Sequence, residues 1–182
     1  MFIWDASSGD RILGPLTGHE QGVTALSYSR DSKKLVSGSN GSIAVWDSES
    51  GTKVYGFTTH HTSWIVSISF HPSGSTFVTG SDDETINIWD ANTFEPLRKN
   101  LHRHTGTVSS LGHSTDGRHI LSSSWDGRLT IWDVPTGKPI SKLTTRGQGV
   151  LSAAFSRRVN EVLGCDASGV IKVWEVRKLC ED

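Results

Sequence analysis

The chain has 182 residues and a formal net charge of −1, from 19 acidic and 18 basic groups. Because acidic and basic groups are nearly equal in number, the chain has no net electrostatic attraction to nucleic-acid phosphates or anionic lipid. This argues against binding to either through charge. Ser and Thr are abundant, with 26 and 17 residues, whereas there is one Met and there are five Pro. This composition favours short strands and tight turns over helices.

In chain order, residues 1–16 predict two short strands, and longer units follow. Each unit starts with an alternating apolar and polar run, as at 23–28 and 65–70, and continues through a turn into a second strand. A tight polar turn then leads to a third strand that carries a tryptophan, and a shorter strand closes the unit. Alternation between turn residues is typical of antiparallel hairpins. The pattern predicts an all-β fold.

Five tryptophans recur at a nearly constant spacing. They lie 42 or 43 residues apart, each followed by Asp or Glu: Trp4, Trp46, Trp89, Trp132 and Trp174. This period is that of the four-stranded blade of a β-propeller. We therefore assign 1–182 to one repeat domain, with a partial blade at 1–16 and repeats at about 18–49, 60–92, 103–135 and 145–176.

The repeats resemble the WD-repeat β-propeller family over nearly the whole chain. The segment 61–90, which ends in Ile88-Trp89-Asp90, follows the family consensus almost position for position. In amino-acid sequence, the repeats are most similar to the C-terminal WD-repeat arrays of fungal NACHT-type signalling proteins. The resemblance implies a rigid disc that binds peptides or proteins and is not an enzyme.

The resemblance also implies a hydrogen-bonded tetrad in each repeat. Its members are a His before the first strand, a Ser or Thr on the second, an Asp in the next turn and the periodic Trp. Two repeats hold a complete set: His61, Thr79, Asp83 and Trp89 in the second, and His104, Ser122, Asp126 and Trp132 in the third. A buried aspartate needs donors to offset its desolvation, so we expect these tetrads to stabilise their blades.

The other two repeats have incomplete sets. The first has His19, Ser37 and Trp46, but its tight turn is one residue shorter and Asn40 stands in place of the aspartate. The fourth keeps Trp174 alone, with Arg146 at the His position and Ser168 at the Asp position. We expect the fourth blade to be the least stable, or to be stabilised by something outside itself.

His, Ser and Asp also form catalytic triads, but a triad must expose its nucleophile to substrate. Here the trio recurs with the repeat, which indicates a scaffold, and we assign no catalytic residue. Four histidines could be considered as metal ligands: His60, His61, His102 and His104. Two of them belong to the tetrads and no Cys or carboxylate lies at ligand spacing, so we expect no metal and no cofactor.

The two cysteines, Cys165 and Cys180, are too few for a disulfide framework and predict reduced thiols in a cytoplasmic protein. We interpret Cys165 as a small apolar residue of a buried strand. No apolar run reaches the length of a membrane helix, and residues 1–10 lack the features of a secretory signal. We expect no membrane and no nucleic-acid partner.

The predicted strands number one more than four blades need. One closure is an eight-bladed ring of two copies, a homodimer in which 11–16 of one copy completes the sheet of 149–174 in the other. A second is a fragment of a longer repeat protein, since residue 1 begins in mid-motif. The third is a four-bladed ring closed by one chain. We favour the first.

In this family the residues beside the tetrads form the top face, where partners bind. We assign five residues to a partner-binding face: Ser39, Trp64, Asp82, Thr107 and Trp125. The leading hypothesis is a protein-interaction scaffold in an intracellular signalling or sensing assembly. The alternatives are a small-ligand-binding or enzymatic propeller that uses the channel, for which we find no convergent titratable pair, and a truncated array without a partner.

Overall fold

The computed structural model describes residues 1–145, 147–156 and 161–176, and every regular element in these ranges is a β-strand. The seventeen strands form five antiparallel sheets. The all-β prediction is therefore confirmed, and no described segment is a helix that could span a membrane.

Three sheets have four strands each, which follow one another along the chain. We call them blades 1, 2 and 3. Blade 1 contains β3 (Ala25–Tyr28), β4 (Lys34–Gly38), β5 (Ser42–Asp47) and β6 (Lys53–Thr58). Blade 2 contains β7 (Ile65–Phe70), β8 (Thr76–Ser81), β9 (Thr85–Asp90) and β10 (Pro96–His102). Blade 3 contains β11 (Val108–His113), β12 (His119–Ser124), β13 (Arg128–Asp133) and β14 (Pro139–Thr144).

Two smaller sheets complete the described chain. The N-terminal sheet pairs β1 (Ile3–Trp4) with β2 (Arg11–Leu13). Blade 4 contains β15 (Val150–Phe155), β16 (Glu161–Asp166) and β17 (Ile171–Glu175). The strand predicted at 11–16 is thus shorter, because Pro15 has no backbone N–H to donate to a ladder.

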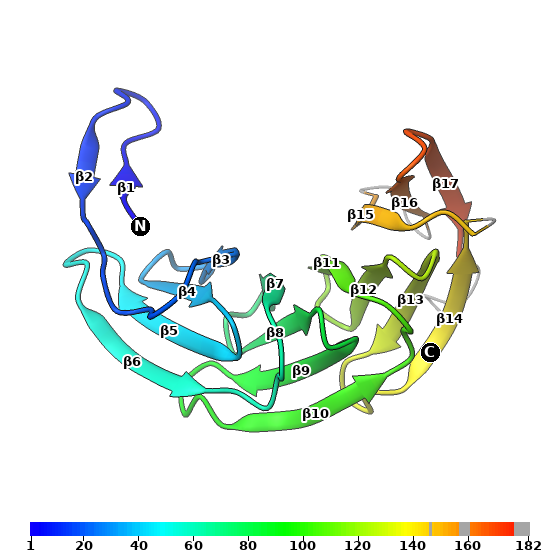
Figure 1. Cartoon of the computed structure of the whole chain (residues 1–182), viewed down its shortest axis with the longest axis horizontal. Helices are drawn as coiled ribbons and strands as arrows, with labels where there is room; N and C mark the ends of the chain where they lie inside the picture. Colours follow the sequence, from blue (N-terminus) through cyan, green and yellow to red (C-terminus); the bar gives the residue numbers. More distant parts are fainter. Residues whose placement is uncertain (146, 157–160, 177–182) are drawn as a thin grey trace.

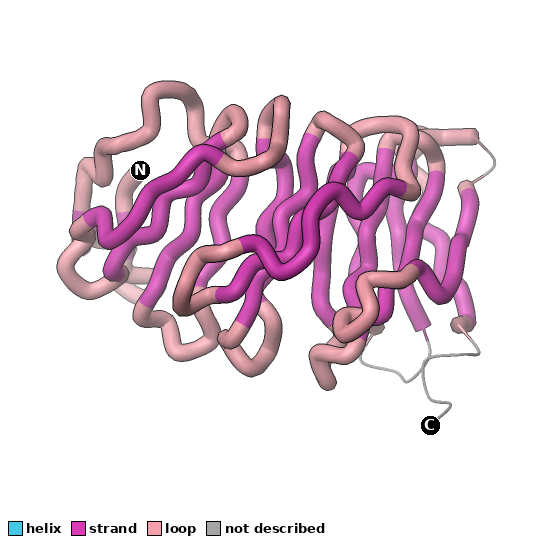
Figure 2. Tube along the Cα trace, turned by 90° about the horizontal axis from the view of Figure 1, so that it is seen from below, coloured by secondary structure: helices cyan, strands magenta, loops and turns pink. Residues whose placement is uncertain are grey.

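The sheets fan around an open centre, with β3, β7, β11 and β15 on the inside and β6, β10 and β14 on the outside (Figure 1). The N-terminal sheet and blade 4 stand at opposite tips of the arc. Seen from the side, the strands run between two rims of loops (Figure 2). The described part of the chain is therefore an open arc, and the closure as a four-bladed ring within one chain is wrong.

The apolar core lies between neighbouring blades. Ile43 and Val45 of β5 pack in one cluster with Ile65 and Trp89 of blade 2. The interface between blades 2 and 3 has the same arrangement, in which Ile86 and Ile88 of β9 pack with Val108 and Trp132. Between blades 3 and 4, Leu129 and Ile131 of β13 pack with Val150. Two apolar residues of each third strand thus face the following blade, and its tryptophan faces the preceding one.

The five periodic tryptophans do not share one environment. Trp46, Trp89 and Trp132 are at most 2 % exposed, whereas Trp174 is half-buried and Trp4 is 59 % exposed. Trp46 is covered by Leu16 and the N-terminal segment, but no described blade precedes the sheet of Trp4. The equal spacing in sequence therefore marks equal positions in the sheets but unequal burial.

Candidate functional site

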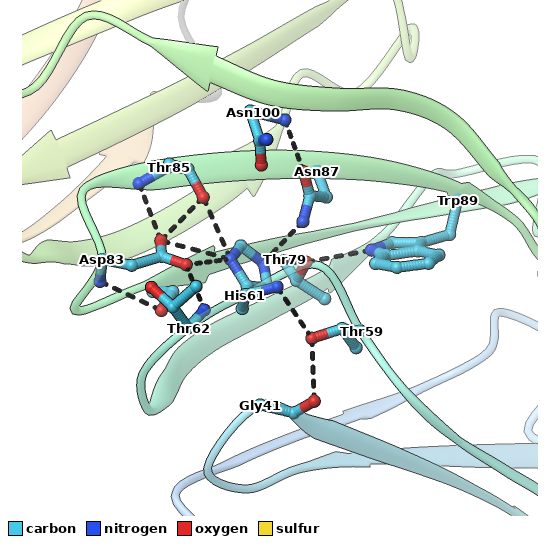
Figure 3. A network of polar contacts seen from close by, with 11 residues as sticks. Gly41, Thr59, His61, Thr62, Thr79, Asp83, Thr85, Asn87, Trp89 and Asn100 are labelled. Atoms are coloured by element: carbon cyan, nitrogen blue, oxygen red, sulfur yellow. Dashed lines mark hydrogen bonds and ion pairs between the residues drawn. The ribbon is translucent and has the colours of Figure 1, made fainter.

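Hydrogen bonds link His61, Thr79, Asp83 and Trp89 in blade 2 (Figure 3). Asp83 Oδ2 lies 3.0 Å from His61 Nδ1, and His61 Nε2 lies 2.7 Å from Thr79 Oγ1. The Trp89 indole donates to the same Thr79 oxygen at 2.9 Å. A neutral imidazole that donates its Nδ1 proton to the carboxylate accepts the Thr79 hydroxyl proton at Nε2. The chain of bonds thus satisfies the indole N–H of a buried tryptophan.

The Asp83 carboxylate accepts three further hydrogen bonds. They come from the Thr62 amide at 2.8 Å, the Thr85 amide at 3.0 Å and the Thr85 hydroxyl at 2.6 Å. Burial acts to raise the pKa of Asp83, but the hydrogen bonds from His61 and Thr85 outweigh it and hold the pKa far below its usual value. Asp83 is therefore an anion at neutral pH, held in place from several sides.

The network extends to the outer strand and to the neighbouring blade (Figure 3). Asn87 Nδ2 lies 3.2 Å from His61 Nε2, and the Asn100 amide donates to Asn87 Oδ1 at 2.6 Å. The His61 amide donates to Thr59 Oγ1 at 3.1 Å, and that hydroxyl donates to the Gly41 carbonyl of blade 1 at 3.0 Å. The polar network consequently connects two blades as well as the strands of one sheet.

Blade 3 has the same arrangement. His104 Nδ1 lies 3.2 Å from Asp126 Oδ2, and His104 Nε2 lies 2.8 Å from Ser122 Oγ, which accepts the Trp132 indole N–H at 2.8 Å. The Thr105 amide donates to Asp126 Oδ2 at 3.0 Å. Burial lowers the pKa of His104, although the Asp126 carboxylate opposes this effect. The imidazole is therefore neutral at neutral pH, as the hydrogen-bond directions in a tetrad require.

In blade 1 the structure brings together only three of the four expected residues. His19 Nε2 lies 2.7 Å from Ser37 Oγ, which accepts the Trp46 indole N–H at 2.8 Å. The expectation that Asn40 takes the place of the aspartate is wrong. Its side chain is exposed, and Nδ2 donates to Gln21 Oε1 at 3.1 Å.

The length of the turn explains the position of Asn40. Gly41 has a φ of +61°, as Glu84 and Gly127 have φ values of +71° and +78° directly after Asp83 and Asp126. Gly41 is therefore the counterpart of the residue after the aspartate. The aspartate position itself is missing from the first repeat, and Asn40 corresponds to Asp82.

Blade 4 keeps only fragments of the motif. Trp174 is half-buried, and Ser168 at the Asp position hydrogen-bonds through its amide and hydroxyl to Asp166 Oδ1. Asp166 also forms an ion pair with Lys172 at 3.3 Å. Arg146, at the His position, lies outside the described residues. Ser168 thus caps its own turn and does not serve a tetrad.

Comparison with known families decides the assignment. The profile described as WD domain, G-beta repeat (WD40) matches residues 10–47, 51–90 and 95–133. The chain belongs to the WD40 family. A comparison with curated proteins finds no match. The family assignment therefore rests on the repeats themselves, which cover more than half of the chain.

Two solved WD40 structures illustrate the similarity of the fold. "Structure of U3-55K" has a TM-score of 0.82 and 24 % identity, and covers 88 % of this chain and 51 % of that one. "Crystal structure of RRP9 WD40 repeats" has the same TM-score, identity and coverage of this chain, and 50 % of that chain is covered. The chain therefore spans about half the length of these WD40 structures. The similarity shows the fold alone.

The WD40 tetrads have no access for a substrate. The hydroxyl residues Thr79 and Ser122, which would be the nucleophiles of a triad, are fully buried. WD40 repeats are generally non-catalytic, and the described residues contain no group of three or more His, Cys, Asp or Glu that could hold a metal. His60 and His102, considered above as ligands, are exposed. The tetrads have the geometry of internal supports.

The structure separates the five residues assigned to the WD40 top face. Trp125 is 55 % exposed and Asp82 is also exposed, whereas Trp64 and Thr107 are half-buried. Ser39 is only 1 % exposed, and its hydroxyl donates to the Gly22 carbonyl at 2.7 Å. The assignment of Ser39 to a binding face is therefore wrong, because Ser39 is the counterpart of Ser81 and Ser124, which are equally buried, and not of Asp82.

Trp64 and Trp125 lie over glycines of neighbouring blades. A Cβ built on Gly149 would lie 2.8 Å from Trp125 Cε3, and one built on Gly22 would lie 3.8 Å from Trp64 Cζ3. Each indole therefore covers the entry to the first strand of an adjacent blade. The rings thus pack between blades and still present an edge or face on the rim.

Cys165 is half-buried on β16, and its thiol lies 3.7 Å from the Ser152 carbonyl. The expectation of a fully buried filler is thus only partly met, because no described blade covers the far side of blade 4. Cys180 lies outside the described residues.

Sequence reasoning missed a cavity of about 490 Å³ at the opposite rim, between the ends of β3, β7 and β11. His71 and His113 lie there with ring centroids 5.4 Å apart. His113 Nδ1 lies 3.1 Å from Ser69 Oγ, and its buried Nε2 has no partner among the described residues. Burial and, to a smaller extent, the charge of His71 lower the pKa of His113 to about 4. The two histidines come from different positions of their repeats, so no motif signals the pair.

Proposed function

We propose that this chain is a non-enzymatic scaffold that binds a peptide or protein on the top face of its blades. The proposal is carried by the Trp125 side chain, which is 55 % exposed on the rim formed by the tetrad-bearing turns. Tryptophan is enriched among the residues that dominate protein interfaces. Trp64 and Thr107 at the same rim, and the exposed Asp82 carboxylate, supply the remaining contacts.

The cellular setting is part of the proposal. The repeats resemble in sequence those of fungal NACHT-type signalling proteins. This resemblance supports a role in a cytoplasmic sensing or signalling assembly. The net charge of −1 supports a protein partner over nucleic acid or membrane.

The experiment is affinity capture with the full chain and with the Trp64→Ala/Trp125→Ala double variant. We expect the variant to lose partners that the wild type retains, because truncation of an interface tryptophan removes much of the binding energy. Leu97→Ala is the matched control, since Leu97 is 47 % exposed on the outer strand β10. Equal recovery by the wild type and the double variant rejects the proposed face.

We further propose that two copies complete one ring. Ile171 and Val173 of β17 are 71 % and 57 % exposed, whereas their counterparts Ile86 and Ile88 of β9 are at most 2 % exposed. In blades 1 to 3 this pair is covered by the following blade. The flank of blade 4 therefore has the chemistry of an interface between blades.

The opposite tip of the arc carries the complementary surface. Counted back from Trp4, Met1 and Ile3 are the counterparts of Ile171 and Val173, and they pack against the buried cluster of Leu35, Ala44 and Trp46 in blade 1. That surface of blade 1 accepts just such an apolar pair. In an eight-bladed homodimer, β17 of one copy replaces β1 of the other and pairs with its β2.

A longer WD40 protein is the second candidate, favoured by one observation. The similar solved structures are about twice as long as the part of them that this chain covers. In that case a further blade of the same polypeptide covers Ile171 and Val173. The mass of the chain in solution separates the two candidates.

A further inference from the structure

A cavity of about 350 Å³ lies beside His19 in blade 1. His19, Glu20 and Ser42 line it, and they are the counterparts of His61, Thr62 and Thr85 in blade 2. The latter three surround the Asp83 carboxylate. The cavity therefore lies where the other blades hold the carboxylate of the tetrad.

The donors that bind the carboxylate in blade 2 have counterparts without an acceptor in blade 1. His19 Nδ1 has one contact within the described ranges, with Ser42 Oγ at 3.4 Å, which is long for a hydrogen bond. The Glu20 amide has no acceptor among the described residues, although the equivalent Thr62 amide donates to Asp83 at 2.8 Å. An imidazole N–H, a backbone N–H and a hydroxyl thus line one cavity together.

The charge at the cavity favours an anion. Lys53 stands beside Trp46 where the other blades have proline beside their tryptophans, and its ammonium donates to the Gly18 carbonyl at 3.0 Å. Lys53 forms no ion pair with any described residue. Burial and, to a smaller extent, the charge of Lys53 lower the pKa of His19. The imidazole is therefore a neutral donor at neutral pH. Glu20 is the one acidic residue in the lining, and it is exposed.

We propose that this cavity binds a carboxylate, the aspartate or glutamate side chain of a docked polypeptide, which completes the tetrad of the first repeat from outside. A carboxylate accepts from all three donors at once, as Asp83 does, and such charge-assisted bonds are the stronger kind. The site is beside the docking face, since Asn40, which also lines the cavity, forms a β-bridge with Trp64 of that face. The proposal rests on the proposed function only for the polypeptide as the source of the carboxylate.

The test is a titration of the full chain, followed by the imidazole nitrogen resonances of His19 in NMR. The probes are the capped tripeptide acetyl-Gly-Asp-Gly-amide, its Asn analogue, and sodium acetate at constant ionic strength. We expect a saturable His19 shift with the Asp peptide and binding about tenfold weaker for the Asn analogue, a difference of about 1.4 kcal/mol, since hydrogen bonds to a charged acceptor are the stronger ones. Equal binding of both peptides, or no His19 shift, overturns the proposal. Acetate binding as tight as that of the Asp peptide overturns the polypeptide source.

Three variants sharpen the result. Glu20→Gln removes the competing carboxylate and should tighten binding, and Lys53→Gln should weaken it. Insertion of an aspartate between Asn40 and Gly41 gives the turn of blade 1 the same length as the turn of blade 2. This variant should not bind the peptide, because the new carboxylate accepts the hydrogen bonds of the three donors. Unchanged affinity in all three variants contradicts the proposal. The titration needs no natural partner, so its outcome is independent of the capture experiment with Trp64 and Trp125.

Discussion

The rings of Trp89 and Phe57 pack with centroids 5.2 Å apart, although Trp89 belongs to blade 2 and Phe57 to the outer strand of blade 1. Trp89 also stacks on Phe77 of its own blade at 6.2 Å. Its indole therefore contributes to two interfaces, one within the sheet and one between blades. The repeat period describes how each blade is attached to the preceding one, as well as how each sheet is built.

Trp89→Ala should destabilise the protein by about 3–5 kcal/mol, because it leaves a cavity between two blades and removes the donor to Thr79. Trp4→Ala should change the free energy of unfolding by less than about 0.5 kcal/mol in the single chain, since Trp4 is 59 % exposed. Urea melts of both variants measure the difference. Equal losses contradict the account of burial by the preceding blade.

Asp83→Ala should cost about 3–5 kcal/mol of stability, because it leaves His61 and the donors of Thr85 without their acceptor in a buried network. The matched control is Asp82→Ala, one residue earlier and exposed, which should cost less than about 0.5 kcal/mol. The free energies of unfolding come from the same denaturant titration. A loss below about 1 kcal/mol for Asp83→Ala shows that the network is not a support of the blade.

Stability should fall as the pH decreases from about 6.5 to about 4, partly through His113. The unfolded chain binds a proton with the ordinary pKa of histidine, near 6.5, whereas the folded pKa is about 4. Protonation therefore favours the unfolded state throughout this window. In His113→Gln, which keeps a polar group near Ser69, the loss between pH 7 and pH 4.5 should be smaller than in the wild type. An equal loss contradicts the assignment.

The repeat period alone predicts the number and order of the strands, because each tryptophan marks the same position in a sheet. The complete tetrads could also be predicted residue by residue, since His61 and Asp83 stand at the spacing that the fold needs. The position of Asn40 could not be predicted, because the sequence shows that the turn is one residue shorter but not which position is missing. The same uncertainty hides that Ser39 is the counterpart of the buried Ser81 and Ser124.

The contact between His71 and His113 could not be predicted from the sequence, for a different reason. It forms where two blades meet, from positions that no motif relates, so only the packing of the sheets brings the rings together. The unequal burial of Trp4 and Trp46 likewise depends on which blade has a neighbour. Features within one repeat follow from its pattern, whereas features between repeats depend on the assembly.

Sedimentation equilibrium at micromolar concentration tests most directly whether the two tips of the arc are complementary interfaces. The homodimer predicts twice the chain mass of 19.8 kDa, and reversion to 19.8 kDa in the Ile171→Lys/Val173→Lys variant but not in the control Leu97→Lys. A stable mass of 19.8 kDa for the wild type across the concentration range would contradict the two-copy ring.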